Sequence, residues 1–215
     1  MSNAVKIGDR FIGGGHPTYV VAEIGINHNG DVEIAKKLIA AAKDAGVDAV
    51  KFQKRTPELC VPVEQQGQIR ETPWGLITYL EYRYKVEFGE AEYREIDRYC
   101  KEIGMTWFTS VWDKPSVDFM EAFNTVAYKV PSASLTDHEL LKHLRKTGRP
   151  VILSTGMSTM EQIREAVGVL GLKDLVLTHA TSTYPCDPNE LNLLMVHTLK
   201  KEFNVPIGYS GHEVG

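Results

Sequence analysis

Short apolar segments that alternate with helical patterns are the feature that most constrains the fold of this chain. The helical patterns cover about residues 31–44, 91–103, 115–123, 137–147, 160–170 and 189–203. A parallel strand that is buried on both faces is a short apolar run, and repeated strand–helix units predict a parallel sheet. Each run ends in polar residues, and the seven runs are residues 19–23, 49–53, 106–110, 127–132, 151–155, 175–179 and 206–210.

The polar strand ends favour a closed barrel over an open doubly wound sheet. No strand is followed by the Gly-x-Gly-x-x-Gly turn of dinucleotide-binding folds, whereas active sites of (β/α)₈ barrels lie at the C-terminal strand ends. We predict an α/β fold of the (β/α)₈ (TIM) barrel class, with residues 1–215 as a single domain and an N-terminal hairpin within residues 5–18. Only seven strands are found, so we expect the eighth β/α unit to be missing and the barrel to be truncated at its C-terminus. Residues 55–88 read as a long irregular insertion beside the site.

Composition excludes several classes of protein. The 215 residues are 43% hydrophobic and 24% charged, with a net charge of −4 and with Lys and Arg scattered along the chain. We therefore expect no nucleic-acid partner, because a basic patch would mark one. No apolar run approaches the roughly 20 residues of a membrane span, so we expect no membrane association. The three cysteines lack metal-ligand spacing and are consistent with a reducing cytoplasm.

Two lysines inside apolar strands, Lys51 and Lys129, are the strongest chemical signal. Buried charges need partners, and two cations at a barrel mouth suit an anionic substrate such as a phosphate or a carboxylate. The alternative for each lysine is a structural ion pair with Glu23 or another carboxylate. Hydroxyl groups that could bind phosphate oxygens follow several strands: Ser110, Ser132, Ser154, Ser182 and Ser210.

Four further side chains lie at the same strand ends. Glu23 could act as a general base, a metal neighbour or the counter-ion of Lys51. Gln53 follows Lys51 by two residues and so projects from the same strand face. Tyr184 offers either an aromatic lid or a packed loop tyrosine, and the imidazole of His212 suits a divalent metal or acid–base chemistry.

Six motifs in register resemble those of the sialic acid synthases, also called N-acetylneuraminate synthases. The match covers about residues 5–215. The motifs are Ala22-Glu23-Ile24-Gly25-Ile26-Asn27-His28-Asn29-Gly30, Val50-Lys51-Phe52-Gln53, Tyr128-Lys129-Val130-Pro131-Ser132, Ile152-Leu153-Ser154-Thr155-Gly156-Met157, Thr183-Tyr184-Pro185 and Ile207-Gly208-Tyr209-Ser210-Gly211-His212.

The resemblance implies a metal-dependent condensation of phosphoenolpyruvate with an aldehyde amino sugar. N-acetylmannosamine is the acceptor in the type reaction, a nine-carbon 2-keto sugar acid and phosphate are the products, and Mn²⁺ or Mg²⁺ is required. Family members have a (β/α)₈ barrel, often followed by an antifreeze-like domain that reaches across a partner's barrel in a homodimer; no such domain is expected in this chain.

The resemblance also implies roles for individual residues. Glu23 would sit near the reacting carbons, Gln53 and Tyr184 would face the sugar, and His212 would bind the metal, with a second histidine on the eighth strand beyond residue 215. The implied phosphoenolpyruvate ligands are Lys51, Ser110, Lys129, Ser132, Ser154, Ser182 and Ser210.

One departure leaves the acceptor sugar open. Sialic-acid members commonly have Gly-Ser-Gly-Glu after the fourth-strand lysine, where the Glu contacts the sugar, and this chain has Pro131-Ser132-Ala133-Ser134. Sialic, legionaminic, pseudaminic and spore-coat sugar products all stay possible. Two other functions are weighed beside the condensation. The first is a Schiff-base aldolase acting on pyruvate through Lys51 or Lys129, and the second is a non-catalytic barrel that binds anionic ligands.

Overall fold

The computed structural model describes residues 4–214. The chain divides into two compact units, one of residues 20–125 and the other of residues 1–19 together with 126–215. Each unit is described here by itself. The seven predicted strands are all present, three in the first unit and four in the second, and each pairs in parallel with a neighbour in its own unit. The prediction of a parallel α/β fold is confirmed, and closure into a (β/α)₈ barrel stays a prediction.

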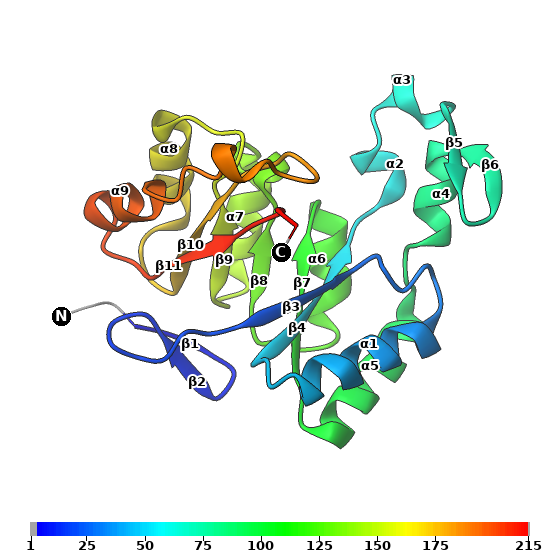
Figure 1. Ribbon diagram of the computed structural model, residues 1–215, viewed down its shortest axis with the longest axis horizontal. Helices are drawn as coiled ribbons and strands as arrows, with labels where there is room; N and C mark the ends of the chain where they lie inside the picture. Colours follow the sequence, from blue (N-terminus) through cyan, green and yellow to red (C-terminus); the bar gives the residue numbers. More distant parts are fainter. Residues whose placement is uncertain (1–3, 215) are drawn as a thin grey trace. The chain divides into compact units, whose positions relative to one another are not determined.

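The first unit is built on three parallel strands in the order β3, β4, β7 (Figure 1). Their bounds are Val21–Gly25, Ala49–Lys54 and Thr106–Val111. Three longer helices pack beside them, α1 (Val32–Asp44), α5 (Glu90–Ile103) and α6 (Lys114–Glu121). The apolar residues of β4 and β7 are almost fully buried, as expected of strands covered on both faces.

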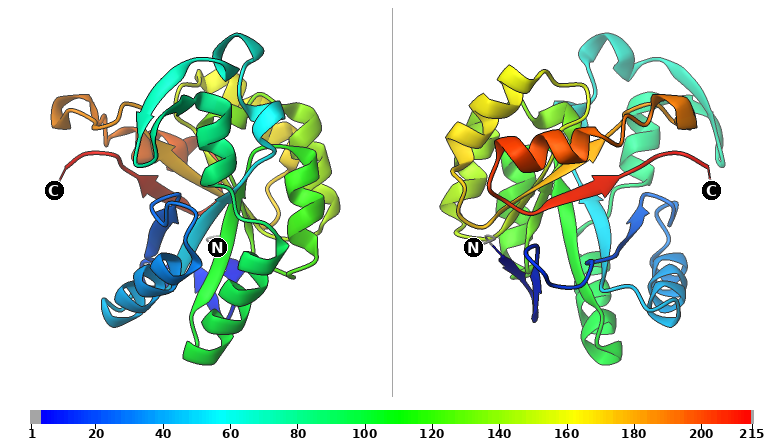
Figure 2. Two further views of the ribbon diagram at one scale, coloured as in Figure 1. Left: turned by 90° about the vertical axis from the view of Figure 1, so that its right-hand side faces the viewer. Right: turned by 60° about the vertical axis from the view of Figure 1, so that its left-hand side comes forward.

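The insertion after β4 is ordered, so the prediction of an irregular stretch over residues 55–88 is wrong. It holds three short helices, α2 (Pro57–Cys60), α3 (Val63–Gln66) and α4 (Tyr79–Lys85). Strands β5 (Ile69–Thr72) and β6 (Gly75–Thr78) form an antiparallel hairpin that stands in front of α4 in the left view of Figure 2. The hairpin turns at Pro73 and Trp74, and Gly75 directly after them has a φ of +89°, which suits glycine.

The second unit contains four parallel strands in the order β8, β9, β10, β11. They span Tyr128–Val130, Val151–Ser154, Leu175–Ala180 and Ile207–Ser210. The predicted N-terminal hairpin is confirmed, since β1 (Val5–Ile7) pairs antiparallel with β2 (Arg10–Ile12). Helices α7 (His138–Lys146) and α8 (Met160–Leu170) pack together. Helix α9 (Met195–Glu202) lies against β10 and β11 in the right view of Figure 2.

The last predicted helix is shorter than expected. Residues 189–203 were predicted as one helix, but α9 begins only at Met195, and a 3₁₀ turn occupies Pro188–Glu190. Asn192 has a φ of +46°, which interrupts any right-handed helix between the two segments. A second 3₁₀ turn, Ser132–Ser134, follows β8.

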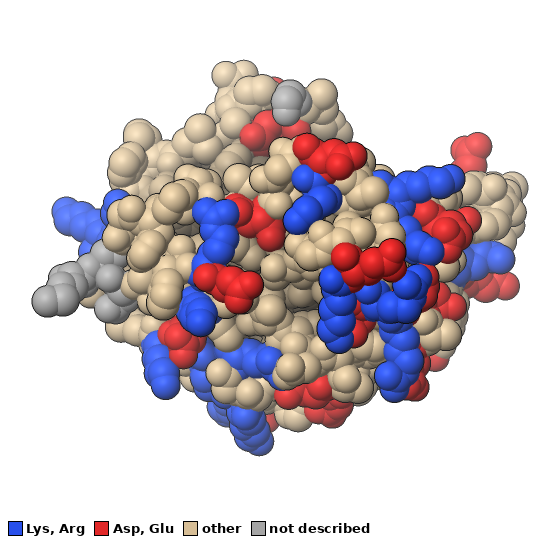
Figure 3. All heavy atoms as spheres, turned by 90° about the horizontal axis from the view of Figure 1, so that it is seen from below, with Lys and Arg blue, Asp and Glu red and all other residues tan. Residues whose placement is uncertain are grey.

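Charged side chains are interleaved on the surface, as the scattered Lys and Arg predicted. Blue and red groups lie next to one another over the face drawn in Figure 3, and no broad patch of one sign is seen there. Much of this comes from ion pairs one helical turn apart, such as Arg94–Glu90 and Lys101–Asp97. No helix within residues 4–214 is both long and apolar enough to cross a bilayer.

Candidate functional site

A buried lysine lies at the centre of the first cluster of polar side chains. Lys51 projects from β4 with only 4% of its surface exposed. Its Nζ donates to Ser110 Oγ at 2.7 Å and forms an ion pair with Glu23 Oε2. The sheet register explains this geometry, because Glu23 and Lys51 are paired residues on adjacent strands and so share one face. Three predicted site residues therefore lie together.

The environment of Lys51 disfavours the protonated form of its amine. Burial is the largest effect and lowers the pKa of the amine, Glu23 opposes that shift, and the nearby Arg55 adds to it. An amine held in this way can bind an anion strongly when it is protonated. It is also the kind of lysine that serves as a nucleophile when it is neutral. The cluster is compatible with either chemistry.

Gln53 extends the cluster in the direction of the insertion. Its Nε2 donates to Glu23 Oε1 at 3.4 Å, which confirms the expected placement of Gln53 on the same side as Lys51. Its Oε1 accepts from Arg55 Nη2. Arg55 is buried and was not singled out from the sequence. The adjacent pair Lys54-Arg55, directly after an apolar strand, is the signal that could have identified it.

Three hydroxyl groups of the second unit gather around the ends of β9 and β10. Ser132 Oγ accepts from the backbone N–H of Gly156 at 3.0 Å. A Cβ on Gly156 would lie 2.8 Å from Ser132 Oγ and 2.7 Å from Ser182 Oγ, so only glycine fits between these hydroxyls. Ser154 is buried and shares a hydrogen bond of 3.0 Å with Thr178 Oγ1. The predicted serines Ser132 and Ser182 thus face a common point beside a backbone N–H.

Lys129 and Ser210 form a second lysine–hydroxyl pair in the same unit. Lys129 Nζ lies 3.2 Å from Ser210 Oγ, although the two residues are 81 positions apart in the chain. The pairing of β8 with β9, of β9 with β10 and of β10 with β11 places their C-terminal ends at one edge of the sheet. A lysine amine, serine hydroxyls and a backbone N–H at one sheet edge are suitable donors for the oxygens of an anion.

His212 and Tyr184 contact each other after β11 and β10. Tyr184 Oη lies 2.7 Å from His212 Nε2, and the ring centroids are 3.9 Å apart. His212 Nδ1 lies 2.5 Å from the carbonyl oxygen of Thr181. Because a carbonyl only accepts, Nδ1 carries the proton, and the lone pair of Nε2 accepts a hydrogen bond from the Tyr184 hydroxyl.

The ring of His212 is suited to act as one ligand of a divalent ion. A ring held by a backbone carbonyl through one nitrogen is the usual arrangement of a metal-binding histidine. Within residues 4–214 no three His, Cys, Asp or Glu side chains are grouped as a complete metal centre would require. His212 Nε2 is therefore a suitable single ligand for such an ion.

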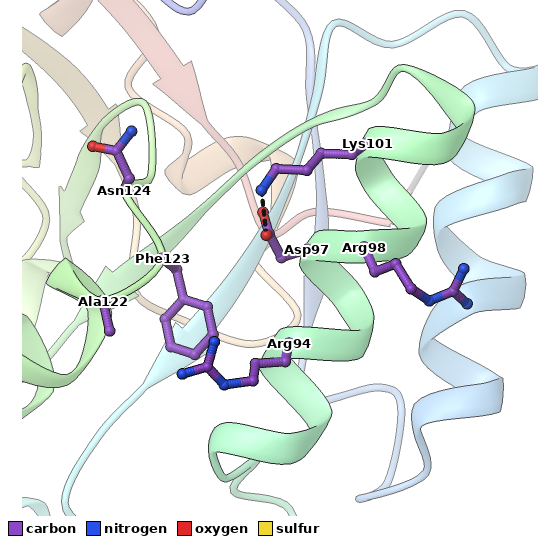
Figure 4. Close-up of a pocket in the computed structure, with 7 residues that line it drawn as sticks. All are labelled: Arg94, Asp97, Arg98, Lys101, Ala122, Phe123 and Asn124. Carbon is purple, nitrogen blue, oxygen red and sulfur yellow. Dashed lines mark hydrogen bonds and ion pairs between the residues drawn. The ribbon is translucent and has the colours of Figure 1, made fainter.

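A surface pocket beside α5 is a poor candidate site. It has a volume of about 470 Å³ and is lined by three cations, Arg94, Arg98 and Lys101, and by Asp97 (Figure 4). Lys101 is bonded to Asp97 at 2.6 Å, and both arginines pair with glutamates of the same helix. The charges are balanced by ion pairs within α5, as on an ordinary solvated helix face. The pocket therefore shows no excess of positive charge that would bind an anion.

Comparisons with known proteins agree on one family. An uncharacterized protein of Methanocaldococcus jannaschii is 41% identical over 214 residues, which is 98% of this chain and 60% of that protein. The human N-acetylneuraminate-9-phosphate synthase is 37% identical over 212 residues, 96% of this chain and 58% of that enzyme. The chain thus spans about 60% of the length of these relatives.

A solved structure shows the same likeness. The N-acetylneuraminic acid synthetase of Leptospira borgpetersenii, crystallised with citrate, matches with a TM-score of 0.91 and 28% identity, over 100% of this chain and 72% of that one. The NeuB family model matches residues 38–215. That range contains most of both clusters, including Lys51, Ser110 and Lys129. On this match, the chain belongs to the NeuB family.

Proposed function

We propose that this chain carries the phosphoenolpyruvate-binding machinery of an enzyme that condenses phosphoenolpyruvate with an aldehyde amino sugar. The observation that carries the proposal is Lys51, a buried amine on a parallel strand that is bonded to Ser110 and Glu23, in a member of the NeuB family. A buried lysine with hydroxyl and carboxylate partners suits an anionic substrate that replaces the carboxylate in part. The second lysine, Lys129, has an analogous hydroxyl partner in Ser210.

The reaction forms one carbon–carbon bond and breaks one carbon–oxygen bond. C3 of phosphoenolpyruvate attacks the aldehyde carbon, water adds to C2, and the bond between C2 and the phosphate oxygen then breaks. One proton of the water ends on the new hydroxyl group and the other on the departing phosphate. The products are a nine-carbon 2-keto sugar acid and inorganic phosphate.

The lysines neutralise the substrate and the leaving group. In this proposal Lys51 and Lys129 bind the carboxylate and the phosphate, and the hydroxyls of Ser110, Ser132 and Ser210 orient their oxygens. Donors that are already held by the fold need no reorganisation as charge moves toward the phosphate. Ser154 and Ser182 complete this set of hydroxyl groups.

Glu23 is the proposed base of the site. Its side chain is 46% exposed, which leaves room for water, and its two oxygens are bonded to Lys51 and Gln53. In this proposal Glu23 accepts a proton from the attacking water. Gln53 and Tyr184 face the acceptor sugar. A divalent ion, Mn²⁺ or Mg²⁺, would be held by His212 Nε2 and would polarise the aldehyde oxygen.

The test is phosphate release from phosphoenolpyruvate with Mn²⁺ and a panel of N-acetylated hexoses. We expect release that depends on both the sugar and the ion. Lys129→Met should weaken phosphoenolpyruvate binding by about tenfold or more, since a charged hydrogen bond is lost. Lys142→Met is the matched control, because Lys142 is an exposed lysine that pairs with Glu139 on α7. Release without any sugar requirement, or equal effects of both substitutions, would contradict the proposal.

A Schiff-base aldolase is the second candidate, favoured by the lowered pKa of Lys51. In that mechanism a neutral amine attacks the ketone of pyruvate. Borohydride reduction in the presence of pyruvate would fix the adduct on the lysine, and mass spectrometry would locate it. We expect no adduct on Lys51 or Lys129, because Glu23 and Ser110 engage the Lys51 amine. A trapped lysine adduct would contradict the proposed condensation and support the aldolase.

A further inference from the structure

Arg55 is a buried charge to which the proposed reaction gives no role. It directly follows β4 and is only 4% exposed. Its guanidinium carbon lies 4.5 Å from the ring centroid of Trp112, and its Nε lies 3.7 Å from Glu87 Oε2. Its backbone N–H donates to the other oxygen of Glu87 at 2.9 Å. A planar guanidinium that is held on several sides presents its remaining N–H groups in a fixed direction.

One of those N–H groups is directed at Gln53. Arg55 Nη2 donates to Gln53 Oε1, and the other end of the same amide, Nε2, donates to Glu23 Oε1 at 3.4 Å. The backbone of Gln53 is held as well, since its carbonyl oxygen accepts from the hydroxyl of the buried Tyr93 at 2.8 Å. The orientation of the side-chain amide is therefore decided by its two partners, Arg55 and Glu23.

The two partners of the amide admit only one orientation. A guanidinium has donors and no acceptor, so the atom that faces Arg55 must be the amide oxygen. Glu23 forms an ion pair with Lys51, and an ionised carboxylate has acceptors and no donor, so the atom that faces it must be the amide nitrogen. Rotating the amide by half a turn would bring two donors together at Arg55 and two acceptors together at Glu23.

Arg55 contributes more to this orientation than Glu23 does. The bond to Glu23 is long at 3.4 Å, and the side chain of Glu23 is 46% exposed and shared with Lys51. Long hydrogen bonds are weak, whereas a hydrogen bond from a charged donor is a strong one. Without Arg55, the Gln53 amide would be held by the weak bond alone.

We propose that Arg55 is a positioning residue that turns the NH₂ group of Gln53 toward the substrate. The proposal rests on the proposed function, in which Gln53 faces the acceptor sugar. Because Arg55 engages Oε1 and Glu23 engages one Nε2 hydrogen, the second Nε2 hydrogen is the donor left for the sugar. Gln53 thus acts as a hydrogen-bond donor and selects an oxygen acceptor on the sugar.

A double-mutant cycle in the phosphoenolpyruvate-dependent reaction tests the coupling of Arg55 to Gln53. The acceptor is the N-acetylated hexose that gives the fastest phosphate release in the panel. Arg55→Met and Gln53→Ala should each raise KM for this sugar by about tenfold and leave KM for phosphoenolpyruvate within about twofold of wild type. Because Arg55 acts through Gln53, the double variant should lose no more than about twofold beyond Gln53→Ala. Additive losses of about a hundredfold would overturn the proposal.

Two further variants separate the contact with Gln53 from the other contacts of Arg55. Lys54→Met is the matched control, because Lys54 also pairs with Glu87, at 3.2 Å, but follows Gln53 directly and so points to the opposite face of β4. It should leave KM for the sugar near the wild-type value, and a loss equal to that of Arg55→Met would refute the role of Gln53. Arg55→Lys should lose less than Arg55→Met, since an amine can still donate to Oε1 but lacks the planar fork. If urea unfolding shows that Arg55→Met does not fold, Arg55→Lys takes its place in the cycle, and coupling of the same sign is expected.

Nuclear magnetic resonance of the Gln53 side chain separates the positioning from the reaction. The two Nε2 protons, assigned by their loss in Gln53→Ala, should exchange more slowly with water in wild type and in Lys54→Met than in Arg55→Met. If no sugar supports phosphate release but this pattern is seen, the proposed function fails and the positioning by Arg55 stands. If condensation occurs and the exchange rates are the same in wild type and Arg55→Met, the positioning role alone fails.

Discussion

The histidine after β3 makes the stability of the fold dependent on pH. His28 is 2% exposed, its ring stacks on Phe88 with the centroids 3.8 Å apart, and its Nδ1 accepts from the N–H of Gly30 at 3.1 Å. Burial lowers the pKa of His28 from 6.5 to about 4, against weaker opposing effects of the Gly25 backbone and of Asp31. His28 is thus a core residue that holds the loop between β3 and α1 in place.

The size of the effect follows from the two pKa values. The unfolded chain binds a proton on this ring below about pH 6.5, and the folded chain does so only near pH 4. The stability contributed by the neutral ring is fully present above the unfolded value and is lost as pH falls toward the folded value. A gap of about 2.5 between the pKa values corresponds to about 3 kcal/mol of unfolding free energy.

Urea unfolding between about pH 7.5 and pH 4 measures this contribution, with His28→Gln as the perturbation. The variant should be less stable at neutral pH, because the ring stacking is lost. Between about pH 7.5 and pH 4, the unfolding free energy of the variant should also fall by about 3 kcal/mol less than that of the wild-type protein, since no ring titrates at this position. His197→Gln, which removes an exposed histidine of α9, is the control. Parallel pH curves for wild type and His28→Gln would refute the reasoning.

Two further substitutions test the second unit. Gly156→Ala should destabilise the protein by about 1–3 kcal/mol and weaken phosphoenolpyruvate binding, because its Cβ would meet Ser132 and Ser182; Gly168→Ala on α8, with nothing within 4 Å of its Cβ, should be neutral or stabilising in the same urea and binding measurements. Equal destabilisation by the two would contradict this account. Tyr184→Phe removes the hydroxyl bonded to His212 Nε2, so Mn²⁺ followed by electron paramagnetic resonance should bind as tightly or more tightly than in wild type. Weaker binding would mean that the hydroxyl assists the ion.

The strands were predictable because burial on both faces leaves a plain signature in the sequence. Each of the seven parallel strands begins and ends within about two residues of its predicted run, and most of their apolar residues are buried. The members of each cluster were predictable for the same reason, since a lysine within a buried strand has few possible placements. Their partners, such as Ser110 for Lys51, depend on which strands are neighbours and on their register.

The insertion was missed although part of its order is encoded locally. Thr78 and Glu81 form a capping box at the start of α4, a spacing that is visible in the sequence. The three prolines and several tyrosines of the segment suggested a loop, whereas the tyrosines stack with arginines such as Arg70 and Arg83. These contacts join residues of the hairpin and of α4, so no single window of sequence predicts them. Arg55 was missed because its role depends on the same segment.

The register of β3 on β4 has a consequence for how this protein can vary. Glu23 and Lys51 face each other as paired residues, and a bulge follows directly, between Glu23 and Gly25. The bulge takes up an extra residue on the loop side of the pair, so a change of length beyond Gly25 does not shift the Glu23–Lys51 register itself. A deletion of one residue between Val21 and Glu23 would turn the carboxylate to the opposite face of the sheet. A change of length before Glu23 should therefore remove the Glu23–Lys51 pair, whereas a change beyond Gly25 should act on stability through the buried His28.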